Sequence, residues 1–477
     1  MLTNFSIACF TSDVARVPLP STRDSGPDAS FFGRTNKYSA LVVAALTLAC
    51  NAGSTQTSAS GGAFGLGGKT ASAGGDADAA GQGGIGGARV PAGDHEVWPN
   101  SESHANSDAW LVNHHEEIRQ MRPRVLLLDF LENGSEAQVR EKAEQVIEAL
   151  AEGSRFHRLE NPDAPAFLQY QISRVVSLPG QAPRSNGAWG YAQLMTGAAF
   201  AEKVGFADPI SGQILTVCEQ FERGYIHEVW VAENPSDPEK LYEFKARSQC
   251  YDVDSHKADG DFDSCAGNGC IIESFDCGVT VRLAEINVDR GPGCATHAYG
   301  HGIENQVLRD QIPYFTDNAE RFFNFNLPSR YDIPISNFYS CPYNDGSPLC
   351  LEYPESGRIE SGPALPDSLS FGPLSFGDGC GNTHFAPHSR FHYDFESGSV
   401  GSALATCRSY GLGDDSGLDP TERISYESYR AYNEDPRFTD CGGGWQLFLR
   451  QNMPGLDNQA RDVDGGKMKN WWPFLFY

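Results

Sequence analysis

The sequence predicts an α/β fold: a layered sheet core with helices, followed by a loop-rich, disulfide-stapled C-terminal part. Two observations predict it. Short apolar runs of strand length alternate along residues 122–288 with segments whose apolar residues recur at helical spacing. Beyond about residue 311 this alternation stops, and proline, glycine, aromatic and cysteine residues dominate. We therefore expect an α/β domain over 94–310 and an aromatic- and cysteine-rich lobe over 311–477 packed on it.

The elements of the α/β domain follow in order. A buried strand is predicted at 122–130 ("RPRVLLLDF"), and the next segment begins with Ser135 and Gln138, the pattern of a helix N-cap. Apolar residues then recur every three or four positions as far as residue 150. Further strands are predicted at 166–178, 225–232 and 279–288, with a helix at 212–224 that ends at Gly224. A last helix begins near Cys294, directly after the final strand.

The N-terminal region has the pattern of an export signal. Residues 34–50 contain Arg34 and Lys37, an apolar run too short to span a bilayer, and a small residue before Cys50. This segment resembles a bacterial lipoprotein signal, in which the cysteine is lipidated; Thr47 stands where leucine is usual. A secretory signal cleaved elsewhere is the alternative. Residues 1–33 do not fit a signal, so we interpret them as a mis-assigned leader.

A tether follows the signal. Residues 51–93 are mostly glycine, alanine and serine and contain almost no large apolar side chain, so this segment cannot bury a core. As a flexible coil it would reach about 35 Å. A lipidated Cys50 and such a spacer together would hold the folded part clear of a membrane. We therefore expect a protein of the bacterial cell envelope, lipid-anchored and outside the cytoplasm.

Charge and cysteine content narrow the class of protein. The formal net charge is −26, which disfavours contact with the phosphates of a nucleic acid. The chain has 13 cysteines, and the pairs in "CAGNGC" (265–270) and "CPYNDGSPLC" (341–350) lack the spacing of structural zinc sites. Short loops closed by neighbouring cysteines are typical of disulfides in an oxidising compartment. We expect a disulfide-bonded extracytoplasmic protein and no nucleic-acid partner.

The helix after the last strand carries the first candidate site, "RGPGCATHAYGHGIEN". His297, His301 and Glu304 stand at i, i+4 and i+7 and share one helical face, a spacing that lets side chains bind one metal ion, zinc above all. The residue after the first histidine is Ala298, where zinc proteases of the HExxH type have a catalytic glutamate. A merely polar, half-exposed face is the alternative.

Two cysteines suggest other roles. Cys294 follows a tight glycine turn at a helix N-terminus, where the helix dipole stabilises a thiolate, so it is a candidate nucleophile. Apart from Cys50, eleven cysteines follow the signal. Because this number is odd, at least one thiol stays unpaired in a monomer. Cys218, inside an apolar helix, is the candidate for that free thiol.

The second candidate site is "CGNTHFAPHSRFHYDF", residues 380–395, which contains His384, His388, His392 and Asp394. Pro387 and the flanking glycines predict a loop rather than a helix. Such a loop could close over a site formed by the first helix, because functional side chains often lie on loops held by a rigid scaffold. Surface histidines without a function are the alternative.

The chain ends in "NWWPFLFY", a run of large aromatic and apolar side chains. Left exposed, these side chains would promote aggregation, so we expect them to pack into the core. A carbohydrate-stacking platform built on Trp471 and Trp472 is the alternative.

Three of these stretches, "RGPGCATHAYGHGIEN", "NTHFAPHSRFHYDF" and "QNMPGLDNQARDVDGGKMKNWWPFLFY", resemble a family of extracytoplasmic bacterial proteins without an established activity. The resemblance runs from about residue 108 to the end. It implies that the pattern RGxG followed by HxxE, here Arg290 to Gly293 and His301 to Glu304, belongs to the shared part. It also implies that His297 and His388 vary among relatives.

Two functions fit these patterns. The first is a metal-assisted hydrolase of extracellular peptide or glycan. In that case His301 binds the metal or transfers protons, Glu304 is a ligand or general base, and Arg290 holds an anionic or carbonyl group. His384 and Asp394 join from the C-terminal loop, and His297 assists. The second is a non-catalytic surface protein that binds glycan or protein through its aromatic C-terminal half. The two differ in whether His301 lies near His384 and whether the terminal tryptophans are exposed.

Overall fold

The structure is a computed structural model of the 477-residue chain. It describes residues 95–185, 188–233, 275–308, 310–326, 379–389, 393–395, 402–413 and 418–477, together with the short strands that lie between these ranges. The predicted leader (1–33), signal (34–50) and tether (51–93) lie outside the described residues. So do His392 and the side chains of the cysteine pairs at 265–270 and 341–350.

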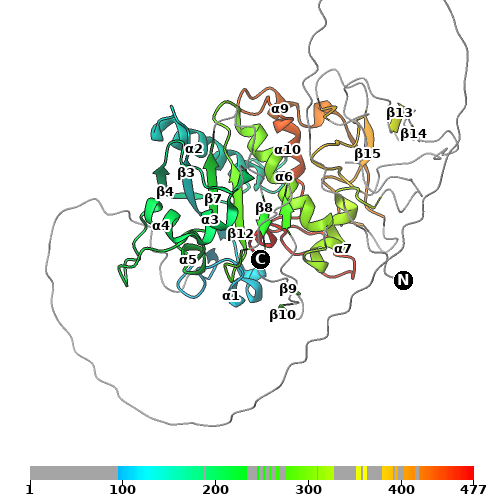
Figure 1. Ribbon diagram of the computed structural model, residues 1–477. Helices are drawn as coiled ribbons and strands as arrows, with labels where there is room; N and C mark the ends of the chain where they lie inside the picture. Colours follow the sequence, from blue (N-terminus) through cyan, green and yellow to red (C-terminus); the bar gives the residue numbers. More distant parts are fainter. Residues whose placement is uncertain are drawn as a thin grey trace, which may run out of the picture. The chain divides into compact units, whose positions relative to one another are not determined.

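The described residues form an α/β fold around a central sheet (Figure 1), as the sequence predicts. Its strands lie in the order β11-β8-β12-β7-β3-β4. The four strands β3 (Arg124–Asp129), β4 (Gln171–Ser177), β7 (Glu228–Ala232) and β12 (Val281–Glu285) pair in parallel. Strands β8 (Phe244–Ala246) and β11 (Cys265–Gly267) extend one edge in antiparallel pairing. The predicted strands are confirmed with narrower bounds.

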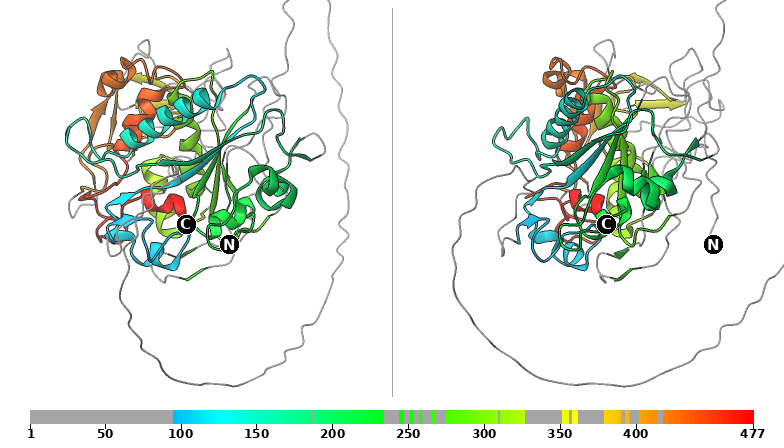
Figure 2. Two further views of the ribbon diagram at one scale, coloured as in Figure 1. Left: turned by 90° about the vertical axis from the view of Figure 1, so that its left-hand side faces the viewer. Right: turned by 60° about the vertical axis from the view of Figure 1, so that its left-hand side comes forward.

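Helices cover both faces of this sheet (Figure 2). Helix α2 (Glu136–Gly153) follows β3 and packs on one face beside α6 (Pro292–Leu308). Helices α3 (Tyr191–Thr196), α4 (Ala198–Val204) and α5 (Val217–Glu222) cover the other face. Consecutive residues of β3 alternate between these layers: Val125 and Leu127 face α2 and α6, while Leu126 and Leu128 face α3–α5. Both faces are buried, which is why β3 reads as a continuous apolar run.

Local signals explain where these helices start and stop. The side chain of Ser135 accepts a hydrogen bond from the backbone N–H of Gln138, which confirms the predicted N-cap of α2. Thr216 and Glu219 form a reciprocal capping box at the start of α5. After α5 the chain turns at Gly224, whose φ of +65° is in the left-handed region that favours glycine. Its backbone also passes so close to His104 that a Cβ atom would clash with the His104 carbonyl.

The C-terminal part shares the core on the α2 and α6 side of the sheet. Its helices among the described residues are α7 (Pro313–Phe322), α9 (Arg430–Asn433) and α10 (Gly443–Gln451), and α10 packs on both α2 and α6. Every residue of α10 is buried, so it lacks the one-sided apolar pattern by which a surface helix is recognised. Short pairs β13 (Leu351–Glu355) with β14 (Arg358–Ser361) and β15 (Ala403–Ala405) with β16 (Glu422–Ile424) complete this part.

The aromatic end of the chain is buried. The last turn is the 3-10 helix η4 (Trp472–Phe476), and Trp471, Trp472 and Tyr477 are each at most 1% exposed. Trp471 packs edge-on against Phe315 and Phe322 of α7. This confirms that the terminus completes the core, and the alternative of a carbohydrate-stacking platform on these tryptophans is wrong.

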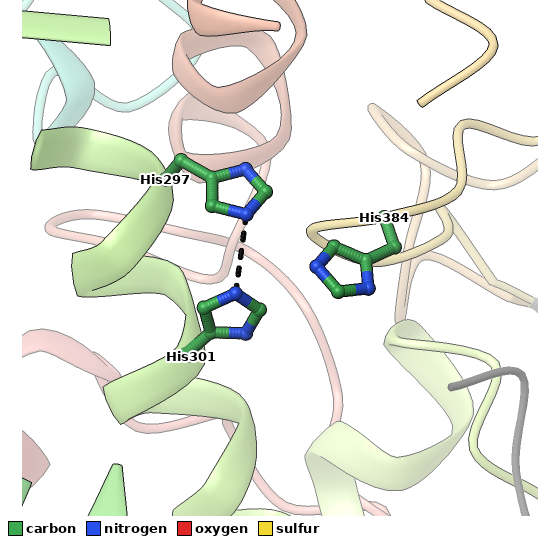
Figure 3. A group of neighbouring side chains, drawn as sticks. All are labelled: His297, His301 and His384. Carbon is green, nitrogen blue, oxygen red and sulfur yellow. Dashed lines mark hydrogen bonds between the residues drawn. The ribbon is translucent and has the colours of Figure 1, made fainter. Parts of the chain in front are cut away.

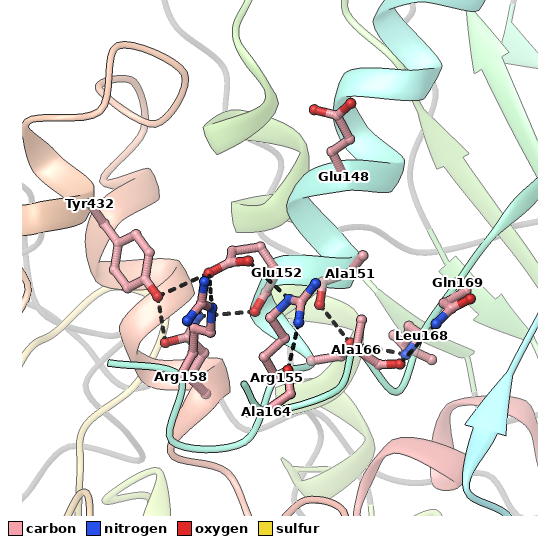
Figure 4. Close-up of polar contacts among 12 residues, drawn as sticks. Glu148, Ala151, Glu152, Arg155, Arg158, Ala164, Ala166, Leu168, Gln169 and Tyr432 are labelled. Carbon is pink, nitrogen blue, oxygen red and sulfur yellow. Dashed lines mark hydrogen bonds and ion pairs between the residues drawn. The ribbon is translucent and has the colours of Figure 1, made fainter. Parts of the chain in front are cut away.

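Polar contacts join the end of α2 to the C-terminal part (Figure 4). The hydroxyl of Tyr432 donates to the carboxylate of Glu152 at 3.2 Å and to the side-chain oxygen of Gln451 at 2.8 Å. Arg155 and Arg158 form ion pairs with the same carboxylate. Because Gln451 ends α10, this network fixes α10 relative to α2, and α10 in turn lies against α6.

Smaller elements complete the described chain. These are β1 (Val97–Trp98) paired with β2 (Gln120–Met121), α1 (Ala109–Asn113), η1 (His115–Glu117), β5 (Arg184–Ser185) paired with β6 (Ala188–Trp189), β9 (Tyr251–Asp252) paired with β10 (Lys257–Ala258), and η3 (Tyr426–Ser428).

Three disulfides join described cysteines: Cys218 with Cys277, Cys294 with Cys441, and Cys380 with Cys407. They support the predicted disulfide-bonded class and indicate an oxidising, extracytoplasmic compartment. Two predictions are corrected here. Cys218 is not a free thiol, because β12 is preceded by a turn that brings Cys277 beside α5. Cys294 is not a nucleophile, because its sulfur is bonded to Cys441, just before α10.

Candidate metal centre

The candidate site forms where α6 meets the C-terminal part. Tyr299, Ile303 and Val307 lie on the face of α6 that packs into the core beside the sheet. His297 and His301 project from the opposite face, a half-turn away, as the helical spacing requires. Glycine at position 300 permits the close approach of the C-terminal part, because a Cβ there would lie 2.4 Å from the hydroxyl of Thr383. The absence of a side chain at 300 therefore lets the 379–389 segment approach the histidine face.

Three histidines from two distant segments meet at this contact. The Nε2 atoms of His297 and His301 lie 3.1 Å apart, and the ring of His384 points toward both (Figure 3). One ring nitrogen from each residue falls within 4.8 Å of the other two. All three side chains are at least nine-tenths buried. Three imidazole nitrogens directed at one buried point form a typical ligand set for a transition-metal ion.

The spacing of these nitrogens fits one ion. Two nitrogens bound at about 2.0–2.1 Å to a tetrahedral zinc ion lie about 3.3 Å apart, close to the His297–His301 distance of 3.1 Å. Burial, followed by the charges of His301, Arg450 and Arg290, holds the pKa of His297 well below its usual 6.5. The ring is thus neutral at pH 7, which is the form that binds a metal. A backbone hydrogen bond with Cys441 acts on the same ring, in the way that metal-bound histidines are commonly oriented.

The loop that carries His384 is held in place by its neighbours. The side chain of Asn382 accepts hydrogen bonds from the backbone N–H groups of His384 and Phe385 and so fixes a tight turn. From α10, Trp445 donates to the carbonyl of Asn382 at 2.8 Å and Gln446 to that of Thr383 at 2.7 Å. The 379–389 segment contains no helix or strand, as Pro387 predicts. Helix α10 therefore positions this loop against α6.

Tyr393 completes the group. Its hydroxyl lies 3.0 Å from Nε2 of His384 and 3.4 Å from Nε2 of His297, and the residue is 38% exposed. Its φ of +63° places a non-glycine residue in the left-handed region, which costs about 1–2 kcal/mol. The backbone N–H of Tyr393 donates to the carbonyl of His384, so the loop imposes this conformation. The tyrosine is the part of the group nearest to solvent.

Glu304 does not join the three histidines. Its carboxylate accepts a hydrogen bond from the backbone N–H of Thr383, next to His384, and the side chain is fully buried. The guanidinium of Arg450 acts on the same carboxylate and donates to backbone carbonyls of Gln446 and Thr296. The group of three thus contains His384 in the place for which the sequence proposes Glu304. Glu304 and Arg450 instead join α6, the loop and α10.

Burial raises the pKa of Glu304 to about 8, against hydrogen bonds with Thr383 and the charge of Arg450, which lower it. Between pH 4.5 and 8 the folded protein therefore keeps a proton that the unfolded chain has released, so this group lowers stability as pH rises through that window. Glu304→Gln lacks the titration and should gain up to about 1.4 kcal/mol in unfolding free energy per pH unit relative to the wild type. Denaturant unfolding of both proteins in chelator, from about pH 5 to pH 8, measures this difference. Parallel pH profiles would contradict the assignment.

The other predicted site residues lie around this group. Arg290 is exposed just before α6, and its charge lowers the pKa of His297. Asp394 follows Tyr393 and is buried; burial of Tyr429, and after it the charge of Asp394, raises the pKa of Tyr429. His388 is buried and its Nε2 lies 3.1 Å from the Tyr429 hydroxyl. A second cluster, Cys294, Cys441 and Asp440, contains the bonded cysteines and so lacks the free thiolates that a metal would need.

Sequence reasoning did not identify Tyr393, Gln446 or Arg450 as parts of this region. Tyr393 stands in the quoted "HYDF" motif, and its position nine residues after His384 was the only signal available. Gln446 and Arg450 lie four apart on α10, a helix that the sequence did not predict.

Comparison with known proteins adds no relative: no family model, curated protein or solved structure matches this chain. Within the part of the chain that the structure describes, no helix has the length and apolar character needed to cross a membrane. The fold and site together define a globular α/β domain with disulfides and a buried three-histidine group that can bind a metal ion.

Proposed function

We propose that His297, His301 and His384 bind a divalent metal, with zinc the best fit, and that the protein is an extracytoplasmic metal-assisted hydrolase. One observation carries the proposal: three buried imidazoles meet at the spacing of metal ligands. The third imidazole, of His384, comes from a loop at least 83 residues away in the sequence from the other two. Three protein ligands that leave a further position are typical of catalytic rather than structural zinc.

The chemistry of such a site is hydrolytic. A bound zinc ion would lower the pKa of water and polarise a carbonyl or phosphoryl oxygen. The residues of the chain would divide the remaining work. Arg290, exposed at the start of α6, would hold an anionic or carbonyl group of the substrate. Glu304 and Arg450 would position the His384 loop, since both are buried and neither faces solvent.

The alternative, a non-catalytic protein that binds glycan or protein partners, would be favoured by exposed terminal tryptophans and widely separated histidines. Trp471 and Trp472 are buried, and the rings of His301 and His384 lie 4.8 Å apart between centroids. These observations favour the hydrolase. Peptide and glycan remain the two substrate classes suited to an extracellular protein.

Hydrolysis assays test the proposal. Zinc-loaded wild-type protein should cleave one of a panel of fluorogenic peptide, ester and glycan substrates. Chelator should abolish the cleavage, and added zinc should restore it. His384→Ala should be inactive, and His388→Asn, altered at a buried histidine outside the group, should stay active. Metal binding by the wild-type protein without cleavage of any substrate would favour the binding function.

We also propose that the protein is anchored to the membrane through a lipid on Cys50, because a basic segment and a short apolar run precede that cysteine and a glycine-rich segment follows it. Cys50→Ser should move the protein from the membrane fraction to the soluble extracytoplasmic fraction and remove the mass of the acyl groups. Fractionation with intact-mass analysis measures both. A variant that stays membrane-bound with unchanged mass would rule out the anchor.

A further inference from the structure

Tyr393 occupies a position that the metal proposal leaves open. Its hydroxyl oxygen lies 3.0 Å from Nε2 of His384 and 3.4 Å from Nε2 of His297. Nε2 of His297 lies 3.1 Å from that of His301. Ligand atoms around a tetrahedral ion with bonds of about 2.0–2.2 Å are separated by about 3.3–3.5 Å. Three of the six separations among these four atoms, at 3.0–3.4 Å, thus lie within about 0.4 Å of the edges of one ligand tetrahedron.

We infer that the phenol oxygen of Tyr393 is the fourth ligand of the resting metal site. This inference rests on the proposed metal binding by the three histidines and goes beyond it by assigning the remaining position. The ring of Tyr393 lies 4.8 Å from the ring of His384 and 5.3 Å from that of His297, so the side chain already faces the same point.

Charge supports the assignment. Three neutral imidazoles would leave the full charge of a divalent ion in a buried site, close to the guanidinium of Arg450, whose charge already acts on His297. Coordination as phenolate, with the phenol proton passing to solvent, brings one negative charge to the ion. The cysteines next in sequence to the site, Cys294 and Cys380, are both disulfide-bonded and cannot supply that charge as thiolate.

The ligand is also placed for exchange. Tyr393 is 38% exposed, whereas the three histidines are buried, so it is the member of the set that a water molecule or substrate can displace first. The resting site would be four-coordinate and closed. Displacement of the tyrosine would open the position that a hydrolytic site needs.

Copper(II) provides the test because a phenolate bound to it gives a visible charge-transfer band that imidazole ligands do not give. Metal-free wild-type protein, titrated with Cu(II) alone, should bind one equivalent and develop this band. Tyr393→Phe removes only the hydroxyl and should bind one equivalent without the band. Tyr426→Phe, in η3, where the ring lies against Tyr429, should keep it.

The outcomes separate the inference from the metal proposal. A wild-type protein that binds one equivalent of Cu(II) without a phenolate band, or a Tyr393→Phe variant that keeps the band, overturns the tyrosine assignment and leaves the histidine site standing. Wild-type protein that binds no metal in stoichiometric amount overturns both. Elemental analysis of each sample gives the stoichiometry, and Zn(II) competition shows whether copper occupies the same site.

Discussion

His301→Ala should reduce metal affinity by more than the roughly 10–100-fold that loss of a supporting residue around a metal costs, because it removes a ligand itself. His301 lies centrally, with Nε2 3.1 Å from that of His297 and its ring 4.8 Å from that of His384. Two remaining histidines cannot hold a buried ion in a closed geometry. Isothermal titration of metal-free protein with zinc measures the change.

The same variant separates a metal site from an inert polar cluster. A ligand that binds only the folded state stabilises it by about 4 kcal/mol when present at a thousand times its dissociation constant. Wild-type protein should therefore melt at a clearly higher temperature with zinc than with chelator, and His301→Ala should show no such shift. His388→Asn, which changes a buried histidine bonded to Tyr429, should retain it. If His301→Ala lowered the melting temperature by many degrees in chelator, and zinc did not stabilise the wild type, the histidines would be structural.

Loss of the disulfide Cys294–Cys441 should have the second large effect, both on the free energy of unfolding and on zinc binding. This disulfide closes a separation of 147 residues and joins the first turn of α6 to Cys441, two residues before α10. Replacing both cysteines by alanine should lower the unfolding free energy by about 2–5 kcal/mol. It should also weaken zinc binding, because the backbone of Cys441 forms a hydrogen bond with the His297 ring. Denaturant unfolding and zinc titration measure the two effects.

The pair Cys218–Cys277 is the matched control. It closes 59 residues on the opposite side of the sheet, beside α5. Its shorter loop should make its loss less costly, by about 1 kcal/mol in the chain-entropy account. Zinc affinity should stay at the wild-type value. Equal loss of affinity in both double variants would mean that the disulfides act on folding alone and not on the geometry around His297.

The fold could be predicted from the sequence because its strands are buried on both faces. Residues 125–128 are all apolar, and 229–231 repeat the pattern, so each strand stands out from the helices between them. Helix α10 could not be predicted in the same way. It begins within a run of three glycines and is buried on all sides, so neither propensity nor one-sided periodicity marks it.

Part of the candidate site could also be predicted from the sequence. His297 and His301 share a helical face because they are four residues apart, and that depends on local geometry alone. Their contact with His384 depends on how a loop 83 residues from His301 packs, which local geometry does not predict. By helical spacing alone, Glu304 was an equally good candidate for the third ligand. Packing decides between them: glycine at 300 admits Thr383, whose backbone N–H binds Glu304 and leaves His384 facing the pair.

Anomalous X-ray diffraction from a crystal of the zinc-loaded protein tests the central claim most directly. The account predicts one anomalous peak at the zinc edge, about 2.0–2.1 Å from Nε2 of each of His297, His301 and His384. An absent peak at that point in zinc-saturated crystals, or a peak bound by other residues while the three rings contact only one another, would contradict it.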